Sequence, residues 1–191
     1  MSRLPLSMIL GSALVLISCA GGVHAANFQL RLLSDAPSGG ASCNDGSPPG
    51  YYYDLVDGST KWMLFLNGGF CCHDEASCAA RWHDSPDLMS SKGWAQSQDL
   101  EGVFSDDVNK SPHFAKSNRI SVGYCSSDSW SGTRDNSSET FGWKFQGHHI
   151  VQAVIKDLIQ NYGMAEADEV VFGGCSAGGR GSIYNLDTVC G

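Results

Sequence analysis

The sequence predicts an α/β fold in which a mostly parallel sheet is flanked by helices, and three segments support this prediction. Residues 61–66, KWMLFL, are almost continuously apolar, as in a strand that is buried on both faces of a sheet. Residues 143–162 repeat apolar side chains at steps of three and four, which indicates a helix with one buried face. Residues 169–173 form a second short apolar strand. A helix that crosses between two strands predicts that the strands are parallel, with a functional site at their carboxyl ends.

The region before the crossover helix predicts further strands and turns. Residues 43–50, CNDGSPPG, are dense in turn formers, and residues 51–56, YYYDLV, are expected to form a strand. We expect this strand to pair as a hairpin with strand 61–66, because a short turn separates the two. A weaker strand is predicted at 119–124. The stretch before it is expected to be rich in loops, with at most a short helix at 78–82.

The crossover helix carries an apolar stripe, and its stop is expected at Gly163. After the strand at 169–173, a turn leads into another predicted helix that carries residues 179–186. The side chains of the stripe are Ile150, Val151, Val154, Ile155, Leu158, Ile159 and Tyr162.

Residues 1–25 are predicted to be a secretory signal peptide. Arg3 supplies the positive end, residues 4–17 the apolar run, and residues 23–25, VHA, a small-residue cleavage site. The run is too short and too interrupted for stable membrane insertion. An alternative is lipid attachment at Cys19, which applies if the source is bacterial. Either interpretation predicts export.

Residues 26–191 are predicted to be part of a single domain, because no repeat, low-complexity tract or linker divides them. The chain has 12 basic and 20 acidic residues, and the basic residues are scattered. This charge balance argues against nucleic acid or an anionic membrane as a partner. It argues only weakly against an acidic polymer as a substrate, because a groove with local positive charge can bind a polyanion even when the net charge of the protein is negative. We expect a monomer.

The cysteines predict disulfides, because export places the chain in an oxidising compartment. The spacing of Cys72 and Cys78 suits a local staple. Cys43 and Cys125 are the next candidate pair, since each lies beside a predicted strand or turn. A zinc site around residues 71–78 is the competing interpretation, but adjacent cysteines without a second ligand pair match no usual zinc spacing. We therefore expect no metal site, and Cys175 is expected to be a small buried side chain.

The strongest chemical signal is a G-x-S-x-G string at residues 174–178, GCSAG. It follows a predicted strand and precedes a predicted helix, which is the context of a nucleophile elbow. Ser176 is therefore the candidate nucleophile. A phosphate-binding loop is disfavoured, because residues 173–179 contain neither G-x-G-x-x-G nor G-K-[ST].

A second candidate element is the string NGGF at residues 67–70, directly after strand 61–66. Enzymes with this elbow complete their oxyanion hole with a backbone N–H from a glycine-rich loop at this place, and pair it with the N–H after the nucleophile. We assign Gly69 and Phe70 from the loop and Ala177 from the elbow. The alternative is a glycine turn that only reverses the chain.

Residues 124–132, YCSSDSWSG, follow a predicted strand and are expected to form a wall of a pocket. An ordinary surface loop is the simpler alternative. Asn136 begins a glycosylation sequon, N-S-S, which is credible if the source is eukaryotic. The histidines all precede Ser176, and none has the sequence context of a triad base.

Four strings in this order resemble the pectin acetylesterase and Notum family: residues 43–52, 62–70, 124–132 and 174–179. The resemblance extends from about residue 42 to the end of the chain. The joint presence of the four strings is specific, and the form SSDxWSG is closer to the Notum branch than to the plant enzymes.

The resemblance implies an α/β-hydrolase-like fold and a secreted, cofactor-free serine carboxylesterase. Family members cleave acetyl esters on pectin or, in Notum, a palmitoleoyl ester on a Wnt serine, so an acylated polysaccharide or an acylated protein is the expected substrate. On the matching positions, Ser176 would be the nucleophile, the amides of Gly69, Phe70 and Ala177 would form the oxyanion hole, and Trp130 would line the acyl side of the pocket.

Two departures from the family pattern affect the expected pocket: Asn67 replaces a usual Glu, and Phe70 a usual Trp. The family's triad Asp and His fall beyond Gly191, so we expect only the N-terminal portion of the fold, with almost no activity on its own. The alternative is a noncatalytic or degenerate glycan- or lipid-binding relative that keeps the elbow as architecture.

Overall fold

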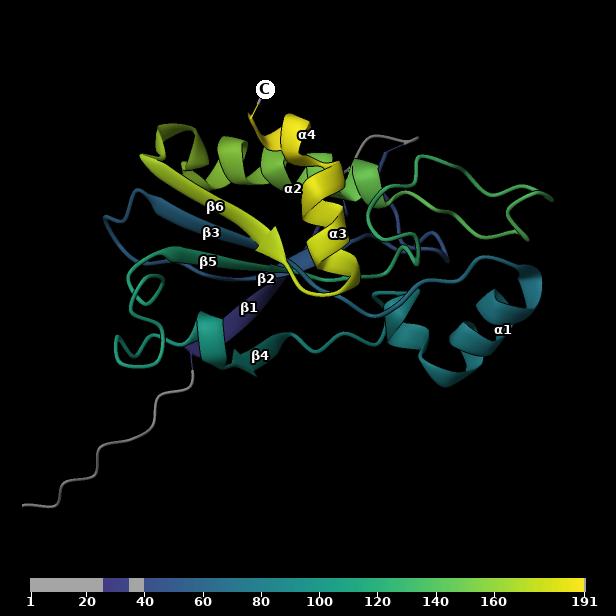
Figure 1. The fold of residues 1–191 in the computed structure, drawn as a ribbon, viewed down its shortest axis with the longest axis horizontal. Coiled ribbons are helices and arrows are strands. Elements are labelled where there is room, and N and C mark those ends of the chain that lie inside the picture. The colour runs from purple at the N-terminus through teal and green to yellow at the C-terminus, as the bar shows by residue number, and fades with distance from the viewer. Residues whose placement is uncertain (1–25, 35–39, 191) are drawn as a thin grey trace, which may run out of the picture.

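The computed structural model describes residues 26–34 and 40–190 of the chain. The predicted signal peptide, with Cys19, lies outside the described residues. Six strands form one sheet in the order β4-β1-β2-β5-β3-β6 (Figure 1). Their bounds are β1 (Ala26–Leu32), β2 (Gly50–Asp54), β3 (Lys61–Leu66), β4 (Ser97–Leu100), β5 (Asn118–Val122) and β6 (Glu169–Gly174).

The sheet is mixed rather than mostly parallel. Strands β5, β3 and β6 run parallel to one another, whereas β4, β1, β2 and β5 pair in antiparallel fashion. The parallel half is the part that the crossover helix predicts, and it carries the elbow at its edge strand.

The predicted hairpin between β2 and β3 is wrong, because β5 lies between these two strands. The connection at residues 55–60 is bonded to the start of β5 instead. The Asn118 side chain accepts from the backbone N–H of Val56 and donates to the carbonyl of Ser59, each at 2.9 Å. These bonds satisfy backbone groups that a hairpin turn would otherwise satisfy internally.

Both faces of β3 are covered, as its apolar sequence predicts. Trp62, Leu64 and Leu66 join the core on the side of α2 (Gly147–Tyr162), and Met63 joins Phe28 on the opposite side. Figure 1 shows α2 lying along the upper face of the sheet. This burial fixes the position of the loop that follows β3 at the carboxyl edge.

The crossover helix α2 begins later than predicted and ends at the expected stop, Gly163, which has a φ of 78°. Of the predicted stripe, Ile150, Val151, Val154 and Leu158 are buried, whereas Ile159 is 44% exposed. The helix therefore presents a narrower apolar face to the sheet than its sequence indicates.

The remaining helices are short. Helix α1 is longer than the short helix expected at 78–82, and Asp74 caps it by accepting from the N–H of Ser77 at 2.7 Å. The helices are α1 (Glu75–Asp84), α3 (Ala177–Tyr184), α4 (Leu186–Cys190), and the 3-10 turns η1 (Pro86–Leu88), η2 (Gly102–Phe104) and η3 (Met164–Glu166).

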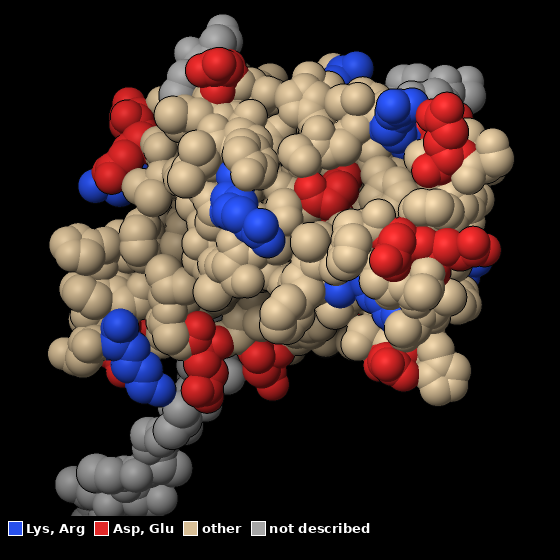
Figure 2. Space-filling view, turned by 45° about the vertical axis from the view of Figure 1, so that its right-hand side comes forward, with Lys and Arg blue, Asp and Glu red and all other residues tan. Residues whose placement is uncertain are grey.

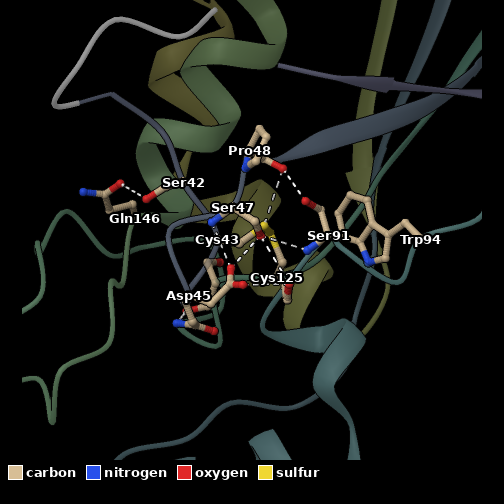
Figure 3. The surroundings of a disulfide bond; sticks show 12 residues. Ser42, Cys43, Asp45, Ser47, Pro48, Ser91, Trp94, Cys125 and Gln146 are labelled. Atoms are coloured by element: carbon tan, nitrogen blue, oxygen red, sulfur yellow. Dashed lines mark hydrogen bonds between the residues drawn. A yellow bond between two sulfur atoms is a disulfide. The ribbon is translucent and has the colours of Figure 1, made fainter. Parts of the chain in front are cut away.

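Both predicted disulfides are confirmed. Cys43 is bonded to Cys125, and Cys72 to Cys78. Figure 3 shows the first of them beneath the turn at 43–48, where Ser91 donates to the carbonyl of Pro48 at 2.6 Å. This bridge ties the turn before β2 to the segment that follows β5.

Acidic and basic side chains are interspersed on the face shown in Figure 2, and no single sign dominates it. Within the described ranges, no helix has both the length and the apolar character needed to cross a bilayer.

The helix α2 is linked to the sheet by Asp157, which is almost buried. Arg31 on β1 donates two bonds of 2.7 Å to its carboxylate, and the Tyr51 hydroxyl on β2 donates another of 2.5 Å. Burial raises the pKa of Asp157, but the bonds from Arg31, Tyr51 and Asn161 outweigh burial and hold the pKa below its ordinary value. The folded state therefore favours the ionised carboxylate.

Replacing Asp157 with Asn is expected to lower the free energy of unfolding at pH 7 by about 1–2 kcal/mol, because charge-assisted hydrogen bonds are lost and the partner Arg31 is partly exposed. A depressed folded-state pKa stabilises above the unfolded-state pKa, so the difference from wild type should shrink as the pH falls below about 4. Urea unfolding at pH 7 and pH 3 measures this. Asp57→Asn, an exposed change, is the control, and a difference that is independent of pH would contradict the assignment.

Candidate active site

The turn between β6 and α3 has the geometry of a nucleophile elbow. Ser176 occupies the sharp corner with a φ of 55° and a ψ of −118°, which is unusual for a residue that carries a side chain. Ser176 is exposed, and its hydroxyl accepts no hydrogen bond from an N–H of the following helix. The strained backbone thus presents the hydroxyl at the surface, as a nucleophile requires.

The elbow is pressed against the carboxyl end of β3. A Cβ added to Gly178 would lie 1.9 Å from the backbone oxygen of Leu66, and one added to Gly174 would lie 2.6 Å from the same oxygen. The N–H of Cys175 donates to this oxygen at 3.3 Å. Only glycine fits at these two places, so the G-x-S-x-G pattern is explained by backbone contact with β3.

In the protein that carries this sequence, replacing Gly178 with Ala is expected to lower kcat/KM for ester hydrolysis by about a hundredfold, because the new methyl group must push the elbow away from β3 and misplace Ser176. The midpoint of thermal unfolding should fall as well. The matched control is Gly173→Ala, since a Cβ at Gly173 meets no atom within 4 Å. Equal activity of the two variants would show that the contact with Leu66 does not position the serine.

The loop after β3 lies directly beside the elbow. A Cβ added to Gly68 would lie 2.6 Å from the carbonyl oxygen of Cys175 and 2.9 Å from Cβ of Ser176. In the part of the chain that the structure describes, the amides of Gly69, Phe70 and Ala177 donate no hydrogen bond. Three free N–H groups near an exposed serine hydroxyl are the components of an oxyanion hole.

Two site predictions from the sequence meet a different environment. Trp130 is fully buried in the core; its indole Nε1 donates to the carbonyl of Asn67 at 3.0 Å, and its side chain packs beside Gly181. The structure thus places Trp130 behind the loop after β3, and its role as the acyl-side wall of the pocket stays a prediction. The prediction of a buried Cys175 is wrong, because the elbow turns this residue outward, where its thiol is unpaired and exposed.

A cavity of about 430 Å³ adjoins the loop after β3. Its lining combines aromatic side chains, such as Tyr52 and Trp94, with the polar Asp87 and Gln98, and it reaches Gly68. Ser176 and the assigned oxyanion donors are not among the residues that line it, so the cavity adjoins the loop at Asn67 and Gly68 rather than the serine itself. The predicted wall at residues 124–132 contributes Tyr124 to it.

The hydrogen bonds that the described histidines make lie away from Ser176, and the buried Nδ1 of His149 has no hydrogen-bond partner among the described residues. His148 bonds to Asn185 at 2.6 Å and to Gln152 at 3.1 Å, and His83 pairs with Asp84 on the surface. None of the hydrogen bonds found for the described histidines reaches the elbow. No group of three or more His, Cys, Asp or Glu among residues 26–34 and 40–190 is arranged to hold a metal ion.

One residue of the site region, Asp128, had no predicted role. Its carboxylate accepts from the Ser126 hydroxyl at 2.7 Å and from three backbone N–H groups, those of Trp130, Gly132 and Gly147, at 2.8–3.2 Å. Burial raises the pKa of Asp128 above its ordinary value even though these donors favour the carboxylate. The Asp with Ser and Gly neighbours at fixed spacing in residues 124–132 was the signal that could have revealed it.

A family model described as pectinacetylesterase matches residues 23–191. The chain is 40% identical over 148 residues to the palmitoleoyl-protein carboxylesterase notum2 of Xenopus laevis, an alignment that covers 78% of this chain and 30% of the relative. It is 36% identical over 189 residues to the palmitoleoyl-protein carboxylesterase NOTUM of Drosophila melanogaster, which covers 96% of this chain and 28% of the relative.

The fold is similar to a solved structure of the Wnt deacylase Notum from Drosophila. The TM-score is 0.79 at 34% identity, and the match covers 86% of this chain and 47% of that chain. This similarity confirms the predicted α/β-hydrolase-like fold. The chain spans less than a third of the length of the two curated relatives.

Proposed function

Since the chain belongs to the pectinacetylesterase family of carboxylesterases, closer to its Notum branch, we propose that the protein is a secreted serine esterase that uses Ser176 as its nucleophile. The observation that carries this proposal is the strained elbow beside free amides. An exposed hydroxyl at a φ of 55° lies next to a loop in which the N–H groups of Gly69 and Phe70 donate no hydrogen bond within the described part of the fold.

In the proposed mechanism, Ser176 Oγ attacks the carbonyl carbon of an ester. The oxyanion that forms is held by the amides of Gly69, Phe70 and Ala177, and the alcohol leaves as the acyl-enzyme forms. Water then attacks the acyl-enzyme and releases the acid. A base must take the proton of Ser176 and return it to the leaving oxygen, and no hydrogen bond found for a described histidine reaches this serine.

The substrate that we propose is an acylated polysaccharide or an acylated protein, processed by a monomer outside the cell. The two disulfides support an oxidising compartment. Asn136 is exposed, as an acceptor for glycosylation must be. No cofactor is required by this mechanism.

The competing function is that of a noncatalytic relative that binds glycans or lipids and retains the elbow as architecture. Covalent labelling separates the two. We expect a fluorophosphonate probe to label the protein that carries this sequence, and peptide mass spectrometry to find the label on Ser176. Ser182→Ala, a change of a serine that donates to the carbonyl of Gly179, should be labelled normally. Absence of the label on correctly folded protein would favour the noncatalytic function.

Acyl preference is measured by hydrolysis of two p-nitrophenyl esters. Hydrolysis of p-nitrophenyl acetate and p-nitrophenyl octanoate by one preparation compares a short with a longer acyl group. Their ratio of kcat/KM assigns the protein to the acetyl-ester or the fatty-acyl branch of this proposal.

A further inference from the structure

The loop after β3, residues 67–72, is held from behind by residues 124–130, and three hydrogen bonds make the connection. The indole Nε1 of Trp130 donates to the carbonyl of Asn67 at 3.0 Å, and the Tyr124 hydroxyl donates to the carbonyl of Phe70 at 2.9 Å. The N–H of Cys72 donates to the carbonyl of Ser127 at 3.1 Å. The loop is thereby fixed at its start, near its middle and at its end.

The first two bonds bracket the proposed oxyanion donors. Trp130 fixes the peptide that joins residues 67 and 68, and Tyr124 fixes the peptide that joins residues 70 and 71. The two peptides between them carry the N–H groups of Gly69 and Phe70. These residues have φ values of 149° and 62°, and a positive φ is unusual for Phe70, which carries a side chain.

Tyr124 controls the direction of its own bond. Its hydroxyl oxygen accepts from the N–H of Ser129 at 2.8 Å, so its single proton is free to point at Phe70. The side chain is almost fully buried, and burial raises the pKa of the phenol, which keeps the proton in place. A flip of the peptide after Phe70 would leave this buried hydroxyl without an acceptor, which is costly.

The ring of Tyr124 also restrains the loop by contact. A Cβ added to Gly69 would lie 3.2 Å from Cδ1 of Tyr124 and 2.9 Å from Leu88, so the backbone at Gly69 rests on these two side chains. On its other sides the ring packs against Trp130, at 5.1 Å between centroids, and under the guanidinium of Arg81, at 5.7 Å. The ring therefore cannot move away without disturbing the core.

We propose that Tyr124 is a positioning residue for catalysis, which acts through its bond to Phe70 to hold the amides of Gly69 and Phe70 in the orientation that receives the oxyanion. This inference rests on the proposed esterase function. It assigns a role to the Tyr at the start of residues 124–132 and predicts an effect on the transition state rather than on substrate binding.

Replacing Tyr124 with Phe removes only the hydroxyl. In the protein that carries this sequence, kcat for p-nitrophenyl acetate should fall about tenfold while KM stays within about twofold, because the donors matter chiefly once the oxyanion develops. The inhibition constant of phenylboronic acid, which forms a tetrahedral adduct with a serine, should rise by about the same factor. A purely structural role would not move this constant in step with kcat.

Tyr51→Phe is the matched control, because it removes another buried phenol hydroxyl, which donates to Asp157 on α2 rather than to the loop after β3. It should lower the midpoint of thermal unfolding and leave kcat within about twofold. Unchanged kcat and boronate inhibition in Tyr124→Phe would overturn the proposal, and so would an equal loss of kcat in both variants. Ser176→Ala, assayed in parallel, distinguishes a failure of the proposed function from a failure of the positioning role. If Ser176→Ala retains turnover, the proposed serine-esterase mechanism with Ser176 as nucleophile is refuted. If Ser176→Ala loses turnover and Tyr124→Phe is unaffected, only the positioning role is refuted.

Discussion

Ser176→Ala is expected to reduce kcat for p-nitrophenyl ester hydrolysis on the order of a millionfold in the protein that carries this sequence, because the acyl-enzyme can no longer form. The residual rate above that in water should come from the oxyanion amides and from binding. KM should change little, since the substitution removes only the hydroxyl of Ser176 and leaves the surrounding residues in place. Steady-state kinetics with an active-site titration of the wild type measures the loss.

The matched control for this change is Cys175→Ala. Cys175 precedes Ser176, and its thiol is exposed and unpaired, so it is the nearest rival nucleophile on the elbow. Its removal should leave kcat within a few fold. If Cys175→Ala abolished turnover and Ser176→Ala retained it, the assignment of the nucleophile to the serine would be refuted.

Most of the elements that position this site follow from their sequences. The apolar run of β3 and the stripe of α2 predict burial against each other, and glycines at fixed spacing predict the elbow. These features are predictable because each depends on local periodicity or on backbone space. The position of the loop at Gly69 follows in turn, since it begins where β3 ends.

Elements with weak local signals escaped prediction. Strand β4 has the sequence SQDL, which is polar and exposed at the sheet edge, so no hydrophobic pattern marks it. Strand β1 begins directly after the predicted signal peptide, so the alternation of apolar and polar side chains along it was not recognised as a strand. The insertion of β5 between β2 and β3 depends on long-range pairing and on the side chain of Asn118, neither of which a local pattern encodes.

The residues that orient the site could not be predicted from the sequence either. Asp128 and Tyr124 lie in a loop rich in Ser and Gly, for which the sequence predicts a pocket wall or an ordinary surface loop but no orienting role for either side chain. Their roles depend on donors and acceptors that approach from distant parts of the chain, such as the N–H of Gly147 and the carbonyl of Phe70. Sequence motifs thus identify the reacting groups, whereas the groups that orient them become visible only after folding.

The two disulfides offer a quantitative test of what holds this fold together. The bridge between Cys43 and Cys125 closes a segment of 82 residues, whereas the bridge between Cys72 and Cys78 closes one of 6. In the loop-entropy description, the long bridge restricts the unfolded chain far more, and the expected stabilisations are about 4.5 kcal/mol and about 2.2 kcal/mol. The long bridge should therefore dominate.

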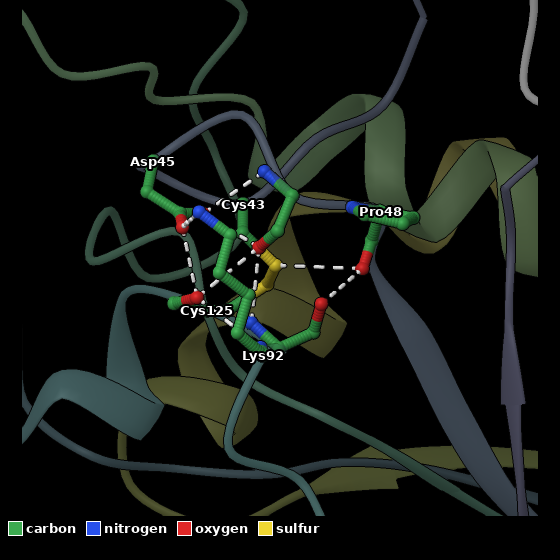
Figure 4. Close-up of polar contacts among 8 residues, drawn as sticks. Cys43, Asp45, Pro48, Lys92 and Cys125 are labelled. Atoms are coloured by element: carbon green, nitrogen blue, oxygen red, sulfur yellow. Dashed lines mark hydrogen bonds and ion pairs between the residues drawn. A yellow bond between two sulfur atoms is a disulfide. The ribbon is translucent and has the colours of Figure 1, made fainter.

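Hydrogen bonds and an ion pair hold the turn around the bridge between Cys43 and Cys125. The N–H of Cys43 donates to Ser47 at 2.9 Å, and the N–H of Asn44 donates to the carbonyl of Cys125 at 2.9 Å. Figure 4 shows the nearby pair of Asp45 and Lys92, whose charged atoms lie 2.9 Å apart. These bonds hold the turn in its native geometry with or without the disulfide. The disulfide is therefore expected to stabilise the protein mainly by restricting the unfolded chain.

The double variant Cys43→Ala with Cys125→Ala is expected to lose about 4.5 kcal/mol of unfolding free energy, which is a large share of the stability of an ordinary domain. Urea unfolding of the oxidised wild type and of each double variant measures the two losses under one set of conditions. Cys72→Ala with Cys78→Ala is the matched control, because it also removes two sulfurs that are largely buried but frees only a short loop. Equal losses in the two variants would refute the loop-entropy explanation and assign the stabilisation to packing around the sulfurs.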